Sequence, residues 1–507
     1  MLLAAATSAD PASAVTESGA AVAAFVLYLT AVVVIGAFSS RFSSAGISEF
    51  FVGGRRMNRY VVALSAVVSG RSAWLLLGMT GLAYVRGASA LWAVVGYISV
   101  ELFLFLSYGR RLRQFSEVHD CVTLPDFFAA RLEDRSGLLR LLLVAIILIF
   151  LVSYVAAQFV AGGKAFSAGF GLEPTQGVLL TAVIILLYTV LGGFLAVSLT
   201  DLMQAVLMLL ALVVLPVLAV AEAGGLGAVL DQLRAIDPAL TDPTAIAVGT
   251  LLGFLGIGLG SPGNPHILTR FMSIDDAEQL RTAAVVGTLW NVLMAGGAIF
   301  IGLAGRVYFP RAEMLVAGDT ENLYPALAQQ LLHPFLFGLV IASIFAAIMS
   351  TADSQLLVAA SGVVRDGYEK VLQRGHQVPQ KRLVQMSRAV VLLLVVLALV
   401  LGLLARDLVF WFVLFSWAGL GAALGPTSIL ALYWRRTTRA GVIAGLVVGT
   451  AVTIVWKLTA PLGGFYELIP AFFSSLAVTM AVSLTTRPPE RVEALMADCR
   501  SSESLRL

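Results

Sequence analysis

Ser65-Ala-Val-Val-Ser-Gly-Arg-Ser-Ala-Trp74 lies in the middle of the second apolar span of this chain, and Gly258-Leu-Gly-Ser-Pro-Gly-Asn-Pro-His266 interrupts the seventh. Small polar residues weaken the first helix, and three glycines with two prolines break the second. A helix that breaks inside a membrane exposes carbonyls, which must line a cavity or bind a ligand. Since the two breaks are five spans apart, we expect two five-helix repeats of opposite orientation around a central site.

The composition places the chain in a membrane. Of its 507 residues 59% are hydrophobic and 12% charged, with a mean hydropathy of +0.92, which excludes an ordinary soluble enzyme. The four histidines supply no metal-binding pair or Ser/His/Asp arrangement, so we expect no enzymatic activity, and we expect no nucleic-acid or obligate protein partner. Thirteen apolar runs are long enough to cross a bilayer; they begin near residues 21, 61, 91, 139, 176, 203, 244, 282, 335, 386, 408, 440 and 466.

The basic residues assign the two faces of the membrane. Twenty-five of the 33 Lys and Arg fall in one set of alternate loops and in the tail, seven fall in the opposite set, and Arg71 lies inside a span. Because cytoplasmic loops are enriched in Lys and Arg, we predict an external N-terminus, a cytoplasmic C-terminus and a location in the cell membrane. Cys121 and Cys499 fall on the cytoplasmic side and are expected to be reduced thiols.

We expect one all-α membrane transport domain over residues 1–485, followed by a short cytoplasmic tail over 486–507. The repeats should cover approximately 60–222 and 244–433. Residues 1–20 contain no Lys or Arg, so the first span is expected to be retained rather than cleaved as a signal peptide.

Charged groups inside a bilayer are expensive and by default mark function. Arg71 either faces the path of a substrate or pairs with an acid on a neighbouring helix. Glu101, one turn into the third span, either pairs with Arg71 or reaches towards the membrane surface. The sequence leaves both alternatives open.

The ninth span carries Ser350, Thr351, Asp353 and Ser354 on neighbouring helical faces. Hard cations such as sodium prefer oxygen ligands of this kind, although helical Ser and Thr also bond to their own backbone. Asp201, at the expected start of the sixth span, is either a helix N-cap or a carboxylate that adds a second cation site.

Six stretches of the chain occur together, and in the same order, in one family of transporters. They are Phe50-Phe-Val-Gly-Gly-Arg55, Leu124-Pro-Asp-Phe-Phe-Ala-Ala-Arg131, Gly192-Gly-Phe-Leu-Ala-Val-Ser-Leu-Thr-Asp201, Gly263-Asn-Pro-His-Ile-Leu-Thr-Arg-Phe-Met272, Ile348-Met-Ser-Thr351 and Ser416-Trp-Ala-Gly-Leu-Gly-Ala-Ala-Leu-Gly-Pro426. By these motifs the chain resembles the sodium/solute symporter family, most closely its sodium/proline symporters. The resemblance implies about thirteen helices, a leucine-transporter-like 5+5 inverted repeat, alternating access, Na⁺ as the coupling ion and no organic cofactor.

The resemblance also implies two sets of sodium ligands. Carried over by motif, the first set consists of the carbonyls of Val68, Arg71 and Ala347 and the hydroxyls of Ser350 and Thr351. Members similar to sialic acid transporters hold a further sodium, which maps to Asp201, Ser350 and Ser354 and here also to Asp353.

The chain departs from proline symporters at the expected substrate site. They usually carry an Asp where this chain has Gly70, and aromatic residues where it has Ile257 and Ser261. A guanidinium attracts a carboxylate, so we expect a zwitterionic or anionic solute, with proline or another amino acid first and a monocarboxylate second. Proton coupling and a transporter-like sensor remain alternatives. The expected substrate-binding residues are Ser69, Arg71, Trp74, Ser261 and Pro265.

Overall fold

The computed structural model describes residues 19–39, 46–374, 376, 378–404, 408–459 and 465–499. Residues 1–18 of the expected transport domain and 500–507 of the expected tail lie outside the described residues. Within the described ranges the chain is helical, apart from loops and one isolated bridge between Met57 and Ile274. This confirms the all-α class.

The first part of the chain alternates long helices with short irregular helical turns. In chain order it forms α2 (Gly19–Ser39), α3 (Ile47–Val52), η1 (Gly53–Arg55), α4 (Arg59–Ala73), η2 (Trp74–Met79), α5 (Thr80–Arg86), η3 (Gly87–Ala90), α6 (Leu91–Phe103), η4 (Leu104–Tyr108), α7 (Gly109–Val118), α8 (Leu124–Arg131), α9 (Leu138–Phe170) and α10 (Pro174–Glu222).

The second part continues the same pattern. It forms α11 (Leu226–Ile236), η5 (Pro238–Thr241), α12 (Val248–Gly256), η6 (Ile257–Gly263), α13 (Pro265–Ser273), η7 (Ala277–Gln279), α14 (Leu280–Tyr308), η8 (Ala312–Met314), η9 (Val316–Gly318), η10 (Thr320–Asn322), α15 (Leu323–Leu331), α16 (Pro334–Ser361), η11 (Gly362–Leu372), α17 (Gln380–Leu404), α18 (Val409–Tyr433), α19 (Arg439–Thr459), α20 (Leu468–Thr485) and α21 (Val492–Asp498).

Each of the thirteen predicted spans has a helical counterpart in the described residues. Among the described residues, ten helical segments are long and apolar enough to cross a membrane, and one of them, Arg59–Val118, covers the second and third predicted spans. The shorter apolar helices Pro174–Leu187 and Val248–Gly263 correspond to the fifth and seventh.

The expected start of the sixth span, near residue 203, is wrong by about ten residues. The long helix α10 breaks at Gly193, whose φ of +65° and ψ of −178° are not helical, and the following apolar segment runs over Gly193–Glu222. A positive φ causes little conformational strain only at glycine, which has no Cβ. Asp201 therefore lies inside a helix, where it is fully buried, and it is not an N-cap.

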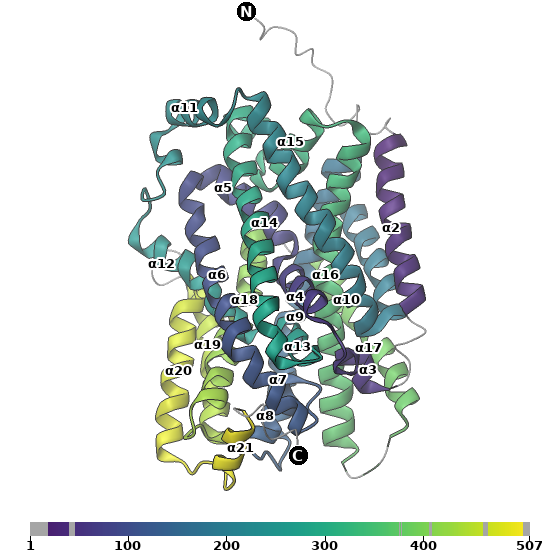
Figure 1. Ribbon diagram of the computed structural model, residues 1–507, viewed down its shortest axis with the longest axis vertical. Helices are drawn as coiled ribbons and strands as arrows, with labels where there is room; N and C mark the ends of the chain where they lie inside the picture. Colours follow the sequence, from purple (N-terminus) through teal and green to yellow (C-terminus); the bar gives the residue numbers. More distant parts are fainter. Residues whose placement is uncertain are drawn as a thin grey trace, which may run out of the picture.

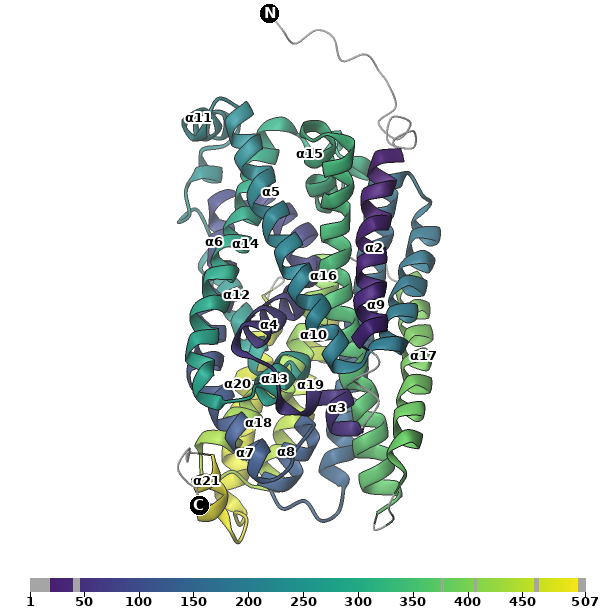
Figure 2. The same cartoon turned by 45° about the vertical axis from the view of Figure 1, so that its right-hand side comes forward.

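The bundle has two distinct ends (Figures 1 and 2). The short helices α11 and α15 lie at one end, and α7, α8 and α21 lie at the other in both views. The tail helix α21 packs onto α7 and α8. His119 Nε2, at the end of α7, lies 3.0 Å from Asp498 Oδ2, and Arg131 of α8 donates to Met496 Sδ at 3.1 Å. Cys121 and Cys499 are buried, and neither forms a disulfide within the described residues. Burial raises the pKa of the Cys121 thiol.

The break in the seventh span lets a tryptophan of α18 approach the backbone. Trp417 donates from Nε1 to the carbonyl of Ile257 at 2.8 Å, and a Cβ at Gly260 would lie 1.9 Å from that nitrogen. Only glycine fits at this crossing of η6 and α18.

Gly260→Ala is therefore expected to lower the free energy of unfolding by about 1–3 kcal/mol or more through overpacking. Gly296→Ala in α14 is the matched control, since no atom lies within 4 Å of its Cβ position. The measurement is the thermal unfolding of the two purified variants in detergent. Equal melting temperatures would contradict the expected clash.

Candidate functional site

The second span breaks at Ser72, in the last turn of α4 and just before η2. Its φ of 51° and ψ of −171° interrupt the helix, and side chains replace the lost backbone partners. Gln158 Oε1 of α9 accepts from the backbone N–H of Ala73 at 3.1 Å, and Ser72 Oγ accepts from the N–H of Trp74 at 3.1 Å. The predicted break is confirmed, and it turns carbonyls of α4 towards α16.

Most of the first predicted sodium set comes together where α4 meets α16. Ser350 Oγ lies 3.4 Å from the carbonyl oxygen of Val68 and 3.1 Å from that of Ala347. Thr351 Oγ1 donates to the carbonyl of Ser69 at 3.0 Å. These groups are buried oxygens of the hard type that suits Na⁺. The Arg71 carbonyl lies in the same break and accepts from the N–H of Trp74.

The second predicted set lies beside the first. Asp201 Oδ2 accepts from Ser65 Oγ at 2.6 Å and lies 3.4 Å from Ser69 Oγ, while Ser354 Oγ donates to Asp353 Oδ1 at 3.2 Å. The other oxygens, Asp201 Oδ1 and Asp353 Oδ2, are buried and have no hydrogen-bond partner in the described part of the chain. The set thus presents two unpaired carboxylate oxygens.

Arg270 of α13 contacts this second set, and the sequence analysis does not identify it. Its side chain is buried. Its guanidinium reaches Asp201 Oδ2 at 3.2 Å, Ser65 Oγ at 3.0 Å and the hydroxyl of Ser354, and it lies 5.1 Å from the ring centroid of Phe194. The helical pattern of the seventh span continues beyond His266, and this continuation was the sequence feature that could have placed Arg270 inside the span. With both acids ionised, one guanidinium leaves a net charge of −1.

An inner pocket lies on the other side of the break. It is lined by Gly70, Arg71, Trp74, Tyr97, Tyr154, Ile257, Val413, Leu414 and Trp417. Of the expected substrate-binding residues, Arg71 and Trp74 therefore reach the pocket. Ser261 and Pro265 are buried but do not line it.

The hydroxyl of Ser69 faces the ion sets, because it lies 3.3 Å from both the Ser350 carbonyl oxygen and Ser354 Oγ.

The aromatic side chains that line the inner pocket, Tyr97, Tyr154 and Trp417, come from α6, α9 and α18. Nothing in the apolar pattern of these helices distinguishes them from ordinary core residues.

Arg71 lines the inner pocket and pairs with Glu101, so the expected pairing with an acid on a neighbouring helix is present. The guanidinium forms a buried ion pair with Glu101 of α6, and Asn291 Nδ2 of α14 donates to the other oxygen of Glu101 at 2.7 Å. Arg71 also lies 4.0 Å from the ring centroid of Tyr97, a cation–π contact. Its Nε is buried without a partner among the described residues.

Glu101 also lies next to the position of the missing aspartate. A Cβ at Gly70 would lie 3.8 Å from Glu101 Oε1. A carboxylate is thus present beside the break, but it belongs to α6 and not to the broken helix α4. It neutralises Arg71, so the pocket does not carry a net positive charge from this pair.

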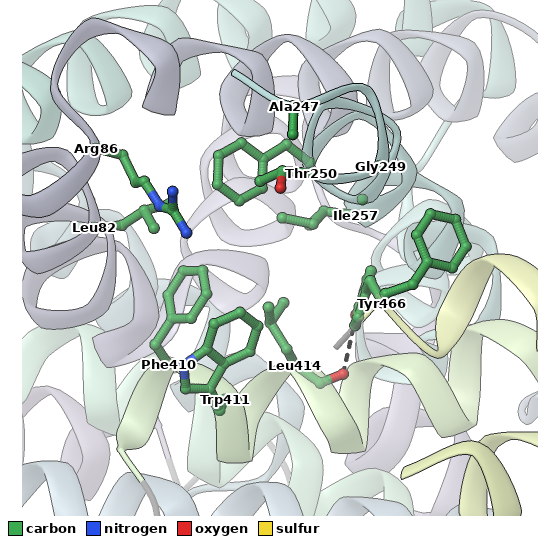
Figure 3. A pocket seen from close by; sticks show the side chains of 13 residues that line it. Leu82, Arg86, Ala247, Gly249, Thr250, Ile257, Phe410, Trp411, Leu414 and Tyr466 are labelled. Atoms are coloured by element: carbon green, nitrogen blue, oxygen red, sulfur yellow. Dashed lines mark hydrogen bonds between the residues drawn. The ribbon is translucent and has the colours of Figure 1, made fainter. Parts of the chain in front are cut away.

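A larger cavity, here called the vestibule, adjoins the inner pocket. It has a volume of about 360 Å³ and is lined by residues of α5, α12, η6 and α18 and by Phe465 and Tyr466 (Figure 3). Ile257 and Leu414 line both spaces. The inner pocket therefore lies directly behind the vestibule.

Solved transporter structures share this architecture. A Na⁺-coupled sialic acid symporter, in a substrate-bound outward-open state, superimposes with a TM-score of 0.78 at 19% identity, covering 93% of this chain and 99% of that one. Mhp1, a nucleobase-cation-symport-1 family transporter, gives a TM-score of 0.55 at 14% identity, covering 90% and 99%. These likenesses bear out the predicted leucine-transporter-like fold class.

Sequence relatives specify the family. The family model of the sodium:solute symporter family matches residues 50–449. The osmoregulated proline transporter OpuE of Bacillus subtilis is 36% identical over 92% of this chain and 94% of its own length. A sodium/proline symporter of Staphylococcus aureus is 37% identical over 91% and 92%. The chain belongs to the sodium:solute symporter family.

Proposed function

We propose that the protein is a sodium-coupled symporter of proline or a similar zwitterionic amino acid, working by alternating access. The observation that carries the proposal is the meeting of the helix break with α16. There the carbonyls of Val68 and Ala347 and the hydroxyls of Ser350 and Thr351 form an oxygen cluster next to a pocket that holds Arg71. An ion bound at the break and a solute in the pocket would each stabilise the same conformation, which couples their binding.

The first set would bind one Na⁺, and the second set would bind another cation. Two carboxylates against the single guanidinium of Arg270, with two unpaired oxygens, favour a cation over an anion at Asp201 and Asp353. The family and the Na⁺-coupled structural neighbour support sodium for this role.

The charge balance of the inner pocket favours a zwitterion over an anion. Arg71 supplies guanidinium donors for a carboxylate, and Glu101 supplies a carboxylate for an ammonium. A monocarboxylate would meet Arg71 but would leave the negative charge of Glu101 without a new partner. The proline-transporting relatives support proline as the first candidate.

We also propose that the N-terminus is external, the C-terminus is cytoplasmic, and the repeats cover approximately 60–222 and 244–433. The segregation of Lys and Arg supports this topology. So does the position of α7, α8 and α21 at one end of the bundle and of α11 and α15 at the other (Figure 1).

Flux in proteoliposomes tests the proposal. Labelled proline is expected to accumulate when an inward sodium gradient is imposed, and a potassium gradient of equal size should give no accumulation. Unlabelled amino acids and monocarboxylates are then compared as competitors. Uptake that follows a pH gradient without sodium would identify proton coupling. Binding without net uptake would identify a sensor.

A further inference from the structure

The two ends of the bundle differ in how much space they leave beside the site. The vestibule lies towards the end that carries α15, because its lining residue Phe410 donates from its N–H to Glu321, just before α15, at 2.8 Å. On the other side of the ion sets, next to Arg270 and Ser354, α3, α8, α13 and α16 enclose only about 10 Å³. One water molecule needs about that much room. A solute can leave at the α21 end only if these helices move apart.

At that end the two broken spans are fixed to each other and to α7. The N–H of Met57, just before α4, donates to the carbonyl of Ser273 at the end of α13 at 3.1 Å, and the N–H of Asp275 donates back to the Met57 carbonyl at 2.9 Å. Arg113 Nε of α7 donates to the Ile274 carbonyl at 2.6 Å. The start of α4, the end of α13 and α7 therefore form one side of the enclosed space.

The helix α8 belongs to the opposite side of the enclosed space. Arg131 Nε, at the end of α8, donates to the carbonyl of Ala431 in α18 at 2.8 Å. Asp126 Oδ1, in the first turn of α8, accepts from Arg140 of α9 at 2.6 Å. These bonds fix α8 to α9 and α18.

The segment of α21 is anchored to this second side. Glu133, just after α8, accepts from the N–H of Glu490 at 3.1 Å and pairs with Arg491 at 2.9 Å. Glu493 of α21 pairs with Arg435 of the loop between α18 and α19 at 3.1 Å. The buried side chain of Met496, which accepts from Arg131, adds an apolar contact to these ion pairs.

The last turn of α21 reaches across to the first side. Asp498 Oδ2 lies 3.0 Å from His119 Nε2, at the end of α7. The His119 ring is held against Phe115 of α7, with ring centroids 4.3 Å apart. The α21 segment therefore spans the boundary between α8 and the unit formed by α7 and the broken spans.

We propose that α21 is a latch that keeps the α21 end of the transporter closed. It stays anchored to α8 and to the loop after α18, and the contact of Asp498 with His119 ties it to α7 and so to the broken spans. Opening at this end breaks that contact, so the latch lowers the population of the open state. The proposal rests on the proposed function, because it takes this end to be cytoplasmic, but it does not depend on which solute is carried.

Thiol labelling measures how often this end opens. Cys121→Ser and Cys499→Ser remove the two cysteines of the chain, and Val358→Cys places one thiol in the wall of the enclosed space. A membrane-impermeant maleimide then labels this reporter slowly in inside-out vesicles. Added to the reporter, Asp498→Asn is expected to raise the initial labelling rate about two- to fivefold, the size of effect that a partly exposed ion pair supplies.

A second variant tests whether His119 and Asp498 act as a pair. His119→Gln should raise the labelling rate as much as Asp498→Asn, and the double variant should show no further increase, since both changes break the same contact. Rate increases that multiply in the double variant would mean that the two residues act separately, which overturns the latch contact.

Asp231→Asn in α11 is the matched control, since Asp231 belongs to an exposed ion pair with Arg234 and lies outside α7, α8 and α21. It should label at the rate of the reporter, and melting temperatures establish that all variants are folded. Equal rates in Asp498→Asn and the reporter would overturn the latch and leave sodium-coupled symport standing. Labelling only in right-side-out vesicles would overturn the topology together with the latch. The expected labelling in a protein that transports no proline would keep the latch and overturn the proposed substrate.

Discussion

Glu101→Gln is expected to lower the free energy of unfolding by about 3–5 kcal/mol, because it leaves a buried guanidinium without its counter-charge. Arg71 and Glu101 are both buried, and Asn291 occupies the second oxygen of Glu101, so water cannot easily replace the missing charge. The measurement is thermal or denaturant unfolding of the purified protein in detergent.

Two further variants separate stability from transport. Glu278→Gln removes one partner of the Arg110 pair, which is partly exposed, and should cost less than about 1 kcal/mol. The double variant Arg71→Met with Glu101→Gln removes both charges and should recover most of the lost stability.

The double variant should nevertheless transport proline poorly, since the guanidinium for the carboxylate is gone. Its sodium dependence should be largely kept, because Arg71 contributes only a backbone carbonyl to the expected ion site. Proline uptake with an unchanged KM in this variant would place Arg71 among purely structural residues.

Thr351→Ala and Ser350→Ala are expected to raise the sodium concentration for half-maximal uptake roughly tenfold or more. Each removes one hydroxyl from the oxygen cluster at the break, and an interaction with a charged group contributes about 1.5–3 kcal/mol. At saturating sodium, most of the uptake should return. The measurement is proline uptake as a function of sodium concentration, with the rise in melting temperature on adding sodium as an independent readout.

Thr427→Ala is the matched control for these variants. Thr427 is also a buried threonine of a spanning helix, but its hydroxyl lies 2.9 Å and 3.1 Å from the carbonyl oxygens of Ala423 and Leu424 in its own helix. Its loss should leave the sodium dependence unchanged. If Thr351→Ala behaves like Thr427→Ala, the cluster at the break does not bind the ion that drives uptake.

The helical class, the spans and their breaks could be predicted because they depend on local sequence. Long apolar runs have few ways to satisfy their backbone in a membrane other than as helices. Three glycines and two prolines within nine residues, as in Gly258–His266, strongly disfavour a continuous helix, whereas the single Pro426 is accommodated inside α18. The start of the sixth span is predicted about ten residues too late, because Gly193 looks like an ordinary small residue of an apolar run until its positive φ is known.

The family motifs identified the oxygen cluster, but the partners of the buried charges required the tertiary structure. Ser350 meets Val68 across 282 positions of sequence, and the motif resemblance made that pairing predictable. No motif pairs Arg270 with Asp201 or Asn291 with Glu101. Hydropathy places a residue at a depth in the membrane and leaves the rotation of each helix open.

The sequence by itself determined that this chain is a transporter with two interrupted helices. Composition, charge segregation and the order of motifs can all be read along the chain without knowing which helices touch. The tertiary structure decided the electrostatics of the site. It showed that Arg71 pairs with Glu101 and that Arg270 pairs with Asp201. The physical reason is that these charges interact over a few ångströms between helices, and only helix packing determines which side chains come that close.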